Sequence, residues 1–152
     1  MSNPIEKATQ VPLAPEQAFA LFTAGIDSWW PKETHSLSAG TDAPARKVAI
    51  EPRLGGLIIE YLANGDTAPW ATITDWQPGE YLAFDWYVGR NPDEATKVSV
   101  RFTPEGNGTR VDLRHWGFEV LGPEAEKIEA SYRGGWDIVL GQCYGGAARK
   151  AG

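Results

Sequence analysis

Few side chains in this sequence could perform chemistry, and His115 is the first of them. It lies in a strand-like segment, on the same side of that segment as Val111 and Leu113. An imidazole has an ordinary pKa near neutrality, so at the end of a pocket it could anchor a ligand or act as a general acid or base. The alternative is a partly buried histidine that hydrogen-bonds to the backbone.

Glu60 and Tyr61 are the other catalytic candidates. They are neighbours in a strand-like segment, so one of them must point inward. The pattern leaves both choices open, because Ile58 and Ile59 are both apolar. An inward Glu60 would need a partner or a raised pKa, and would then be the best catalytic candidate. The sequence shows no Ser-His-Asp order, no phosphate-binding glycine loop and no defensible pair of carboxylates.

The residues that usually hold metals are sparse. The chain has two histidines and one cysteine, widely separated and without the spacing of a metal site. We therefore expect no metal and no cofactor. His35 falls in a polar segment, where we expect it to meet solvent.

Composition and charge exclude several classes of partner. The chain has 152 residues and a net charge of −6, which argues against nucleic acid or an anionic membrane surface as a partner. A single domain over residues 1–152 is expected. Cys143 is the only cysteine, and neither an apolar leader nor a stretch of about 18 apolar residues occurs. These features predict a cytoplasmic protein.

The pattern of apolar residues predicts the elements that must position these groups. Proline at the start of 15–22 is typical of a first helical turn, and Pro31 should end a second short helix at 26–30. Residues 32–45 lack periodicity and are predicted to form a loop. Strands are expected at 5–11, 47–51, 57–62, 70–76, 81–88, 97–103 and 109–116, followed by a helix over 124–150.

Alternation within three successive strands predicts an antiparallel sheet covered on one side. The apolar face would carry Leu82, Phe84, Trp86, Val88, Val98, Val100, Phe102, Val111, Leu113 and His115. Asp85, Tyr87 and the two arginines Arg101 and Arg114 would lie on the solvated face. There the arginines would pair with acids such as Asp85 or Asp112 across strands.

The final segment is amphipathic with helical period. Its apolar side carries Ile128, Tyr132, Trp136, Val139, Leu140 and Cys143, and its charged side carries Glu126, Glu129, Arg133 and Asp137. Gly134 and Gly135 interrupt it, at about 1 kcal/mol each relative to alanine. They favour either a kink that shapes a pocket or close packing against the first short helices.

The order of these elements resembles the helix-grip fold of the START-like, birch-pollen-allergen superfamily known as SRPBCC. Within it, the chain is similar to the family named for the C-terminal domain of the activator of the ninety-kilodalton heat-shock chaperone's ATPase. The similar passages are Trp29-Trp30-Pro31, Arg53-Leu54-Gly55-Gly56, Thr72 to Trp86 around Pro78, Gly108 to His115, and Gly134-Gly135-Trp136. The resemblance implies an α+β fold, with a curved antiparallel sheet of six or seven strands wrapped around a long C-terminal helix.

The resemblance further implies a cavity between the sheet and that helix. The residues expected at this cavity are Trp30, Phe84, Trp86, Phe102, Leu113, His115, Tyr132, Trp136 and Leu140. Aromatic walls with a few polar groups suit a small apolar ligand. The alternative is that the rings fill the space themselves.

Three functions follow as hypotheses. The preferred one is binding of a small hydrophobic or amphipathic molecule, without catalysis or with weak catalysis. The second is an enzyme of the cyclase, dehydratase or hydrolase kind that uses the same cavity. The third is an interaction module, with a chaperone as partner, which predicts an exposed apolar patch near Trp29, Trp30, Trp70 or Trp76. A homodimer is left open.

Overall fold

The computed structural model describes residues 4–32, 34–35 and 46–151 of the chain, and within them one antiparallel sheet dominates. Its order is β1-β7-β6-β5-β4-β3-β2, so the two edge strands come from the N-terminal third of the chain. The strands are β1 (Ile5–Val11), β2 (Lys47–Ile50), β3 (Leu57–Tyr61), β4 (Thr67–Gln77), β5 (Tyr81–Trp86), β6 (Thr96–Glu105) and β7 (Gly108–Trp116).

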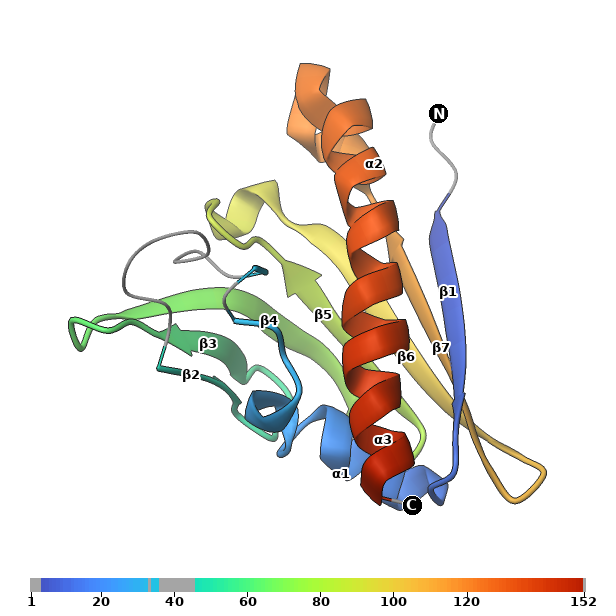
Figure 1. The fold of residues 1–152 in the computed structure, drawn as a ribbon. Coiled ribbons are helices and arrows are strands. Elements are labelled where there is room, and N and C mark those ends of the chain that lie inside the picture. Colours follow the sequence, from blue (N-terminus) through green and yellow to red (C-terminus); the bar gives the residue numbers. More distant parts are fainter. Residues whose placement is uncertain (1–3, 33, 36–45, 152) are drawn as a thin grey trace.

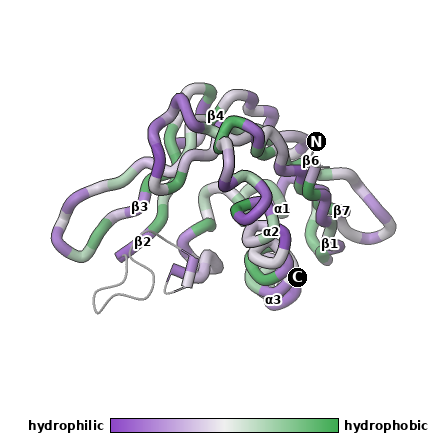
Figure 2. The backbone as a smooth tube through the Cα atoms, turned by 90° about the horizontal axis from the view of Figure 1, so that it is seen from above, coloured by the Kyte–Doolittle hydropathy of each residue, from purple (hydrophilic) through white to green (hydrophobic). Residues whose placement is uncertain are grey.

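One long helical stretch covers the concave side of this sheet. It is continuous through α2 (Ala125–Trp136), η4 (Asp137–Tyr144) and α3 (Gly145–Ala151), and η4 is wound as a π-helix. Figure 1 shows this stretch in red across the sheet, and Figure 2 shows from above that it lies inside the sheet's arc. The shorter elements are α1 (Pro15–Phe22), η1 (Ile26–Ser28), η2 (Pro92–Glu94) and η3 (Phe118–Glu124).

The predicted helix-grip architecture is confirmed, including the two short helices after the first strand. The boundaries differ in places. The strand expected at 70–76 spans Thr67–Gln77, because its pairing with β3 continues past a register shift between Ile58 and Ile59 as far as Thr67. The expected helix at 26–30 is one short 3₁₀ turn. Most of the loop expected over 32–45 lies outside the described residues.

The predicted apolar face of the sheet is confirmed for β5, β6 and β7, whose inward residues are buried beneath the helix. Tyr87 departs from the expectation. It is buried after β5 ends, and its hydroxyl lies 2.8 Å from that of Thr72, so the strand's alternation does not extend to this residue.

Arg101 and Arg114 lie on the solvated face as predicted, but their expected acidic partners are wrong. Each guanidinium instead stacks on an aromatic ring, that of Tyr81 for Arg101 and that of Trp116 for Arg114. The acids are bound by other cations, Lys97 for Asp85 and Arg110 for Asp112. Flat guanidinium groups stack readily on aromatic faces, which explains this choice.

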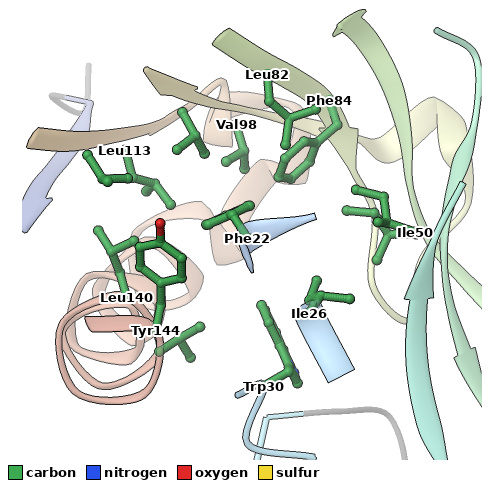
Figure 3. Close-up of a cluster of buried hydrophobic side chains, with 14 of the residues drawn as sticks. Phe22, Ile26, Trp30, Ile50, Leu82, Phe84, Val98, Leu113, Leu140 and Tyr144 are labelled. Carbon is green, nitrogen blue, oxygen red and sulfur yellow. The ribbon is translucent and has the colours of Figure 1, made fainter. Parts of the chain in front are cut away.

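The helix is joined to the sheet and to the first helix by a shared core. Figure 3 shows this core, to which the helix contributes Leu140 and Tyr144, the first helix contributes Phe22, and the sheet contributes Phe84 and Leu113. The Tyr144 hydroxyl donates to the carbonyl of Ala18 in α1 over 2.8 Å. The C-terminal half of the helix is therefore packed against both the sheet and α1.

The charged side of the helix is less exposed than its pattern suggests. Glu129 is only 9% exposed, although it was expected on the solvated side. It accepts a hydrogen bond from Arg133. In the part of the chain that the structure describes, no helix is long and apolar enough to cross a membrane.

Candidate functional site

A pocket of about 320 Å³ opens between the N-terminal half of the long helix, the end of β5 and the segment after η1. The helix contributes Tyr132, Trp136 and Val139, the β5 end contributes Trp86 and Val88, and the segment after η1 contributes residues 30, 34 and 35. The full lining is Trp30, Thr34, His35, Trp86, Val88, Ser131, Tyr132, Gly135, Trp136 and Val139. The pocket thus lies where the resemblance placed it, between sheet and helix.

Local hydrogen bonds hold the segment after η1 over the pocket. The indole N–H of Trp30 donates to the carbonyl of His35 over 2.7 Å. The backbone N–H of His35 donates to the carbonyl of Pro31 over 2.9 Å, which closes the turn. Upstream, the Asp27 carboxylate accepts from the backbone N–H of Val48 in β2 over 2.9 Å. Trp30, Pro31 and His35 are therefore tied to one another, and Asp27, just upstream, is tied to the sheet edge.

Three indole rings form the apolar wall of the pocket. The ring centroids of Trp30 and Trp86 are 6.0 Å apart, those of Trp86 and Trp136 are 5.8 Å apart, and those of Trp30 and Trp136 are 6.3 Å apart. Behind them Trp70 is fully buried, with its ring centroid 5.0 Å from that of Trp30. Tilted and edge-on contacts at these distances are favourable between aromatic rings. They hold the indoles in place without closing the pocket.

Tyr132 places a polar group in this wall. Its hydroxyl oxygen accepts from the indole N–H of Trp86 over 2.9 Å. Burial raises the pKa of Tyr132, with smaller opposing effects from that hydrogen bond and from the charge of Arg90. The hydroxyl therefore stays protonated at neutral pH, and its own hydrogen has no acceptor among the described residues. It is available as a donor to a molecule in the pocket.

His35 is the histidine that lines the pocket, although it was expected to meet solvent. It is half-buried, and its Nδ1 lies 2.7 Å from the Thr34 hydroxyl. Burial lowers its pKa, so the ring is neutral at pH 7. No sequence pattern singled it out, because its position depends on its backbone hydrogen bonds with Pro31 and with the Trp30 indole.

His115 lies outside the pocket lining and is fully buried. Its Nε2 lies 2.6 Å from the Thr96 hydroxyl, and its Nδ1 accepts from the Trp136 indole over 3.0 Å. Burial lowers its pKa to about 3. Both ring nitrogens are occupied by protein partners, so the structure favours the alternative of a bonded core histidine, with side chains rather than backbone as partners.

Glu60 and Tyr61 also lie away from the pocket. Glu60 points inward and is fully buried, and its carboxylate accepts from the indole N–H of Trp70 over 2.9 Å. Tyr61 points outward, where the ammonium group of Lys47 lies 4.7 Å from its ring centroid. The question that the sequence left open is thereby answered: Glu60 is the inward residue.

The residues expected at the cavity divide into two groups. Trp30, Trp86, Tyr132 and Trp136 line the pocket. The others are buried in the core and do not line it: Phe84, Phe102, Leu113, His115 and Leu140. This second group lies among other buried side chains of the helix-to-sheet interface, so a residue on the inward face need not border open space. No group of three potential metal ligands occurs among the described residues.

Several solved structures are similar to this chain. The anthrahydroquino-gama-pyrone synthase Txn09, solved in complex with SUM, is 29% identical over 84% of this chain and 85% of that chain, with a TM-score of 0.59. Protein CV1439 from Chromobacterium violaceum is 15% identical over 97% and 98% of the two chains, with a TM-score of 0.65. CalU16 from Micromonospora echinospora is 17% identical over 93% of this chain and 71% of that chain, with a TM-score of 0.61. The last two show the fold alone.

No curated protein sequence matches the chain. A family model does, over residues 12–142, and this span includes the first helix, most of the sheet and the pocket-lining half of the long helix. The confirmed helix-grip fold agrees with that match. The chain therefore belongs to the family described as Activator of Hsp90 ATPase homolog 1-like protein.

Proposed function

We propose that this protein binds a small aromatic, amphipathic molecule in the pocket between β5 and the long helix. The observation that carries the proposal is the open space of about 320 Å³ beside three indole rings, with polar side chains in its lining. Ligand pockets in proteins begin at about this volume, and they combine apolar walls with a few polar groups that orient the ligand.

The wall of the pocket is rigid before any ligand arrives. The indole N–H groups of Trp30, Trp86 and Trp136 are each hydrogen-bonded to a protein acceptor. A ring whose polar edge is fixed in this way cannot readily swing into the space beside it. A preformed site loses less conformational entropy on binding, which favours affinity for a small ligand.

The similarity to Txn09 supports the same proposal. That chain is 29% identical, and its structure was solved in complex with SUM. The two chains cover each other over more than four fifths of their lengths.

A second candidate function is catalysis in this pocket, of the cyclase, dehydratase or hydrolase kind. The similarity to a synthase favours it. The chemistry would then come from groups at the pocket, such as His35 and Tyr132, since His115 and Glu60 face other protein groups. Turnover of a candidate substrate that survives both His35→Phe and Tyr132→Phe would contradict these roles.

A chaperone-binding role finds less support. Trp29, Trp30 and Trp70 are buried, and Trp76 is partly covered, with its ring packed on Phe19. The large apolar side chains most exposed in the described part of the chain belong to three separate segments: Leu54, Val120 and Ile138.

The binding proposal is tested on the freshly purified protein by native mass spectrometry and then by titration. We expect either an added mass of a few hundred daltons that is lost on denaturation, or saturable binding of 2-naphthol by calorimetry. The matched variants are Gly135→Leu, which places a side chain into the pocket, and Gly134→Leu, whose added side chain meets open space.

We expect Gly135→Leu to lose the binding and Gly134→Leu to retain it. A bare chain mass together with no saturable binding would overturn the proposal. Equal binding by both variants would place the ligand elsewhere, and would overturn it as well.

A further inference from the structure

The ring of His35 is fixed at one edge and open at the other. Its backbone N–H and carbonyl are held by Pro31 and by the Trp30 indole, at 2.9 and 2.7 Å. Its Nδ1 lies 2.7 Å from the hydroxyl of Thr34. These three bonds leave Nε2 as the one ring nitrogen that has no hydrogen-bond partner among the described residues.

The open edge faces the pocket. A methyl carbon built on Gly135 would lie 3.9 Å from both Cδ2 and Nε2 of His35, with no closer contact. Because residue 135 is glycine, the space that a methyl group would occupy beside this edge is left unfilled. Both residues line the pocket, as does Tyr132.

The lining residues that the structure describes carry no compensating charge. The described lining contains no carboxylate, lysine or arginine. Arg90 is outside the lining, and its guanidinium lies 3.9 Å from the Glu94 carboxylate. An anionic ligand group would lose hydration here and gain no cation from the described lining, which is costly. A neutral hydroxyl avoids that cost, and it can both donate and accept. It therefore suits Nε2 in either tautomer.

We propose that His35 determines the ligand class of the pocket, by a hydrogen bond between its Nε2 and the hydroxyl of a neutral hydroxylated aromatic molecule. This inference rests on the proposed function, since it names the class of ligand that the same pocket takes. The aromatic ring lies beside the indoles of Trp86 and Trp136, and its hydroxyl points toward the His35 side of the pocket.

The test compares three probes that share one ring system: naphthalene, 2-naphthol and 2-naphthoate. Calorimetric titration of the wild-type protein should give an affinity for 2-naphthol about fivefold above that for naphthalene, the effect of one net hydrogen bond of about 1 kcal/mol. The affinity for 2-naphthoate, which is ionised, should be the lowest of the three. In His35→Phe, which keeps a ring but has no nitrogen, the ratio of naphthol to naphthalene affinity should fall to about one.

Ser28→Ala serves as the control, because Ser28 lies on the preceding turn, outside the described lining of the pocket, and its hydroxyl donates to the carbonyl of Gly25. It should keep the wild-type ratio. A second readout needs no variant. The chain has two histidines, and 2-naphthol should shift the ring ¹⁵N signals of His35 and leave those of His115 in place.

The outcomes separate the two proposals. If no probe binds the wild-type protein, the proposed function and this inference both fall. If naphthalene and 2-naphthol bind equally well, or if His35→Phe keeps the preference, the pocket is a binding site but His35 does not select its ligand. Tighter binding of 2-naphthoate would overturn the neutral-ligand class.

Discussion

The indole N–H of Trp136 donates a hydrogen bond to Nδ1 of His115 over 3.0 Å, and this bond joins the long helix to β7. An indole can only donate, so Nδ1 must accept and the ring hydrogen resides on Nε2. Nε2 then donates to the Thr96 hydroxyl at 2.6 Å, which in turn donates to the carbonyl of Trp86 at 3.3 Å. A chain of three hydrogen bonds thus runs from the helix to the backbone of β5.

Replacing Trp136 tests how strongly this bond and its ring hold the helix. Trp136 is 3% exposed, so Trp136→Ala should lower the free energy of unfolding by about 3–5 kcal/mol. Trp136→Phe keeps an aromatic ring but leaves Nδ1 of His115 buried without a partner, and should cost about 1–3 kcal/mol. Urea unfolding of the two variants measures both values. A change below about 0.5 kcal/mol for Trp136→Ala would contradict the buried placement.

The buried histidine should make stability depend on pH. Burial lowers the pKa of His115 from 6.5 to about 3, so between these values the unfolded chain binds a proton that the folded protein excludes. The free energy of unfolding therefore falls as the pH drops from 6.5 toward 3, and this loss is absent above 6.5.

The matched variant for that effect is His115→Gln, which keeps a donor and an acceptor but does not titrate. The free energy of unfolding of the wild type minus that of the variant should decrease as the pH falls. The decrease should reach up to about 1.4 kcal/mol per pH unit below pH 6. Urea unfolding at pH 7, 6, 5 and 4 measures the gap. A constant gap over this range would mean that His115 titrates alike in both states.

The two helix glycines should separate stability from binding. Both lie within α2, and neither has a positive backbone φ. Gly134→Ala and Gly135→Ala should each raise the free energy of unfolding by about 0.5–1 kcal/mol, through helix propensity. Only the methyl group at 135 enters the pocket, in ordinary contact with His35. Thermal unfolding measures the increase in stability. A loss of stability in Gly135→Ala would contradict the 3.9 Å separation between the added methyl group and the His35 ring.

Glu60 should behave as a structural acceptor for Trp70. Glu60→Gln keeps an oxygen that can accept from the Trp70 indole N–H, whereas Glu60→Leu leaves that buried donor unsatisfied. We expect Glu60→Leu to lower the free energy of unfolding by about 1–3 kcal/mol more than Glu60→Gln. Guanidinium unfolding of both variants gives the difference. Equal losses would assign the stabilisation to something other than this hydrogen bond.

The sequence could predict the sheet and the helix because each has one buried face, which imposes a period of 2 or 3.6 on the apolar residues. His115 is inward by that rule, and so are Phe84 and Leu140. The rule says nothing of what a buried side chain faces. Tyr132 and Trp136 border open space, whereas Leu140, on the same helix, meets the packed core.

His35 could not be predicted as a site residue for a different reason. Its position depends on hydrogen bonds from Trp30 and to Pro31 that no periodic pattern signals. The doublet Gly134-Gly135 was the one available signal. A Cβ at Gly134 would meet nothing within 4 Å, and one at Gly135 would meet only the His35 ring at 3.9 Å, so the expected close packing against the first short helices is wrong. Gly135 instead lines the pocket.

The central claim, a ligand pocket walled by indoles, is tested most directly by the indole N–H signals of the seven tryptophans in a ¹H–¹⁵N spectrum during titration with 2-naphthol. We predict saturable shifts for Trp30, Trp86 and Trp136, which line the pocket, and none for Trp76 and Trp116, which do not. No shifts at any indole, or shifts centred on Trp76 or Trp116, would contradict the account.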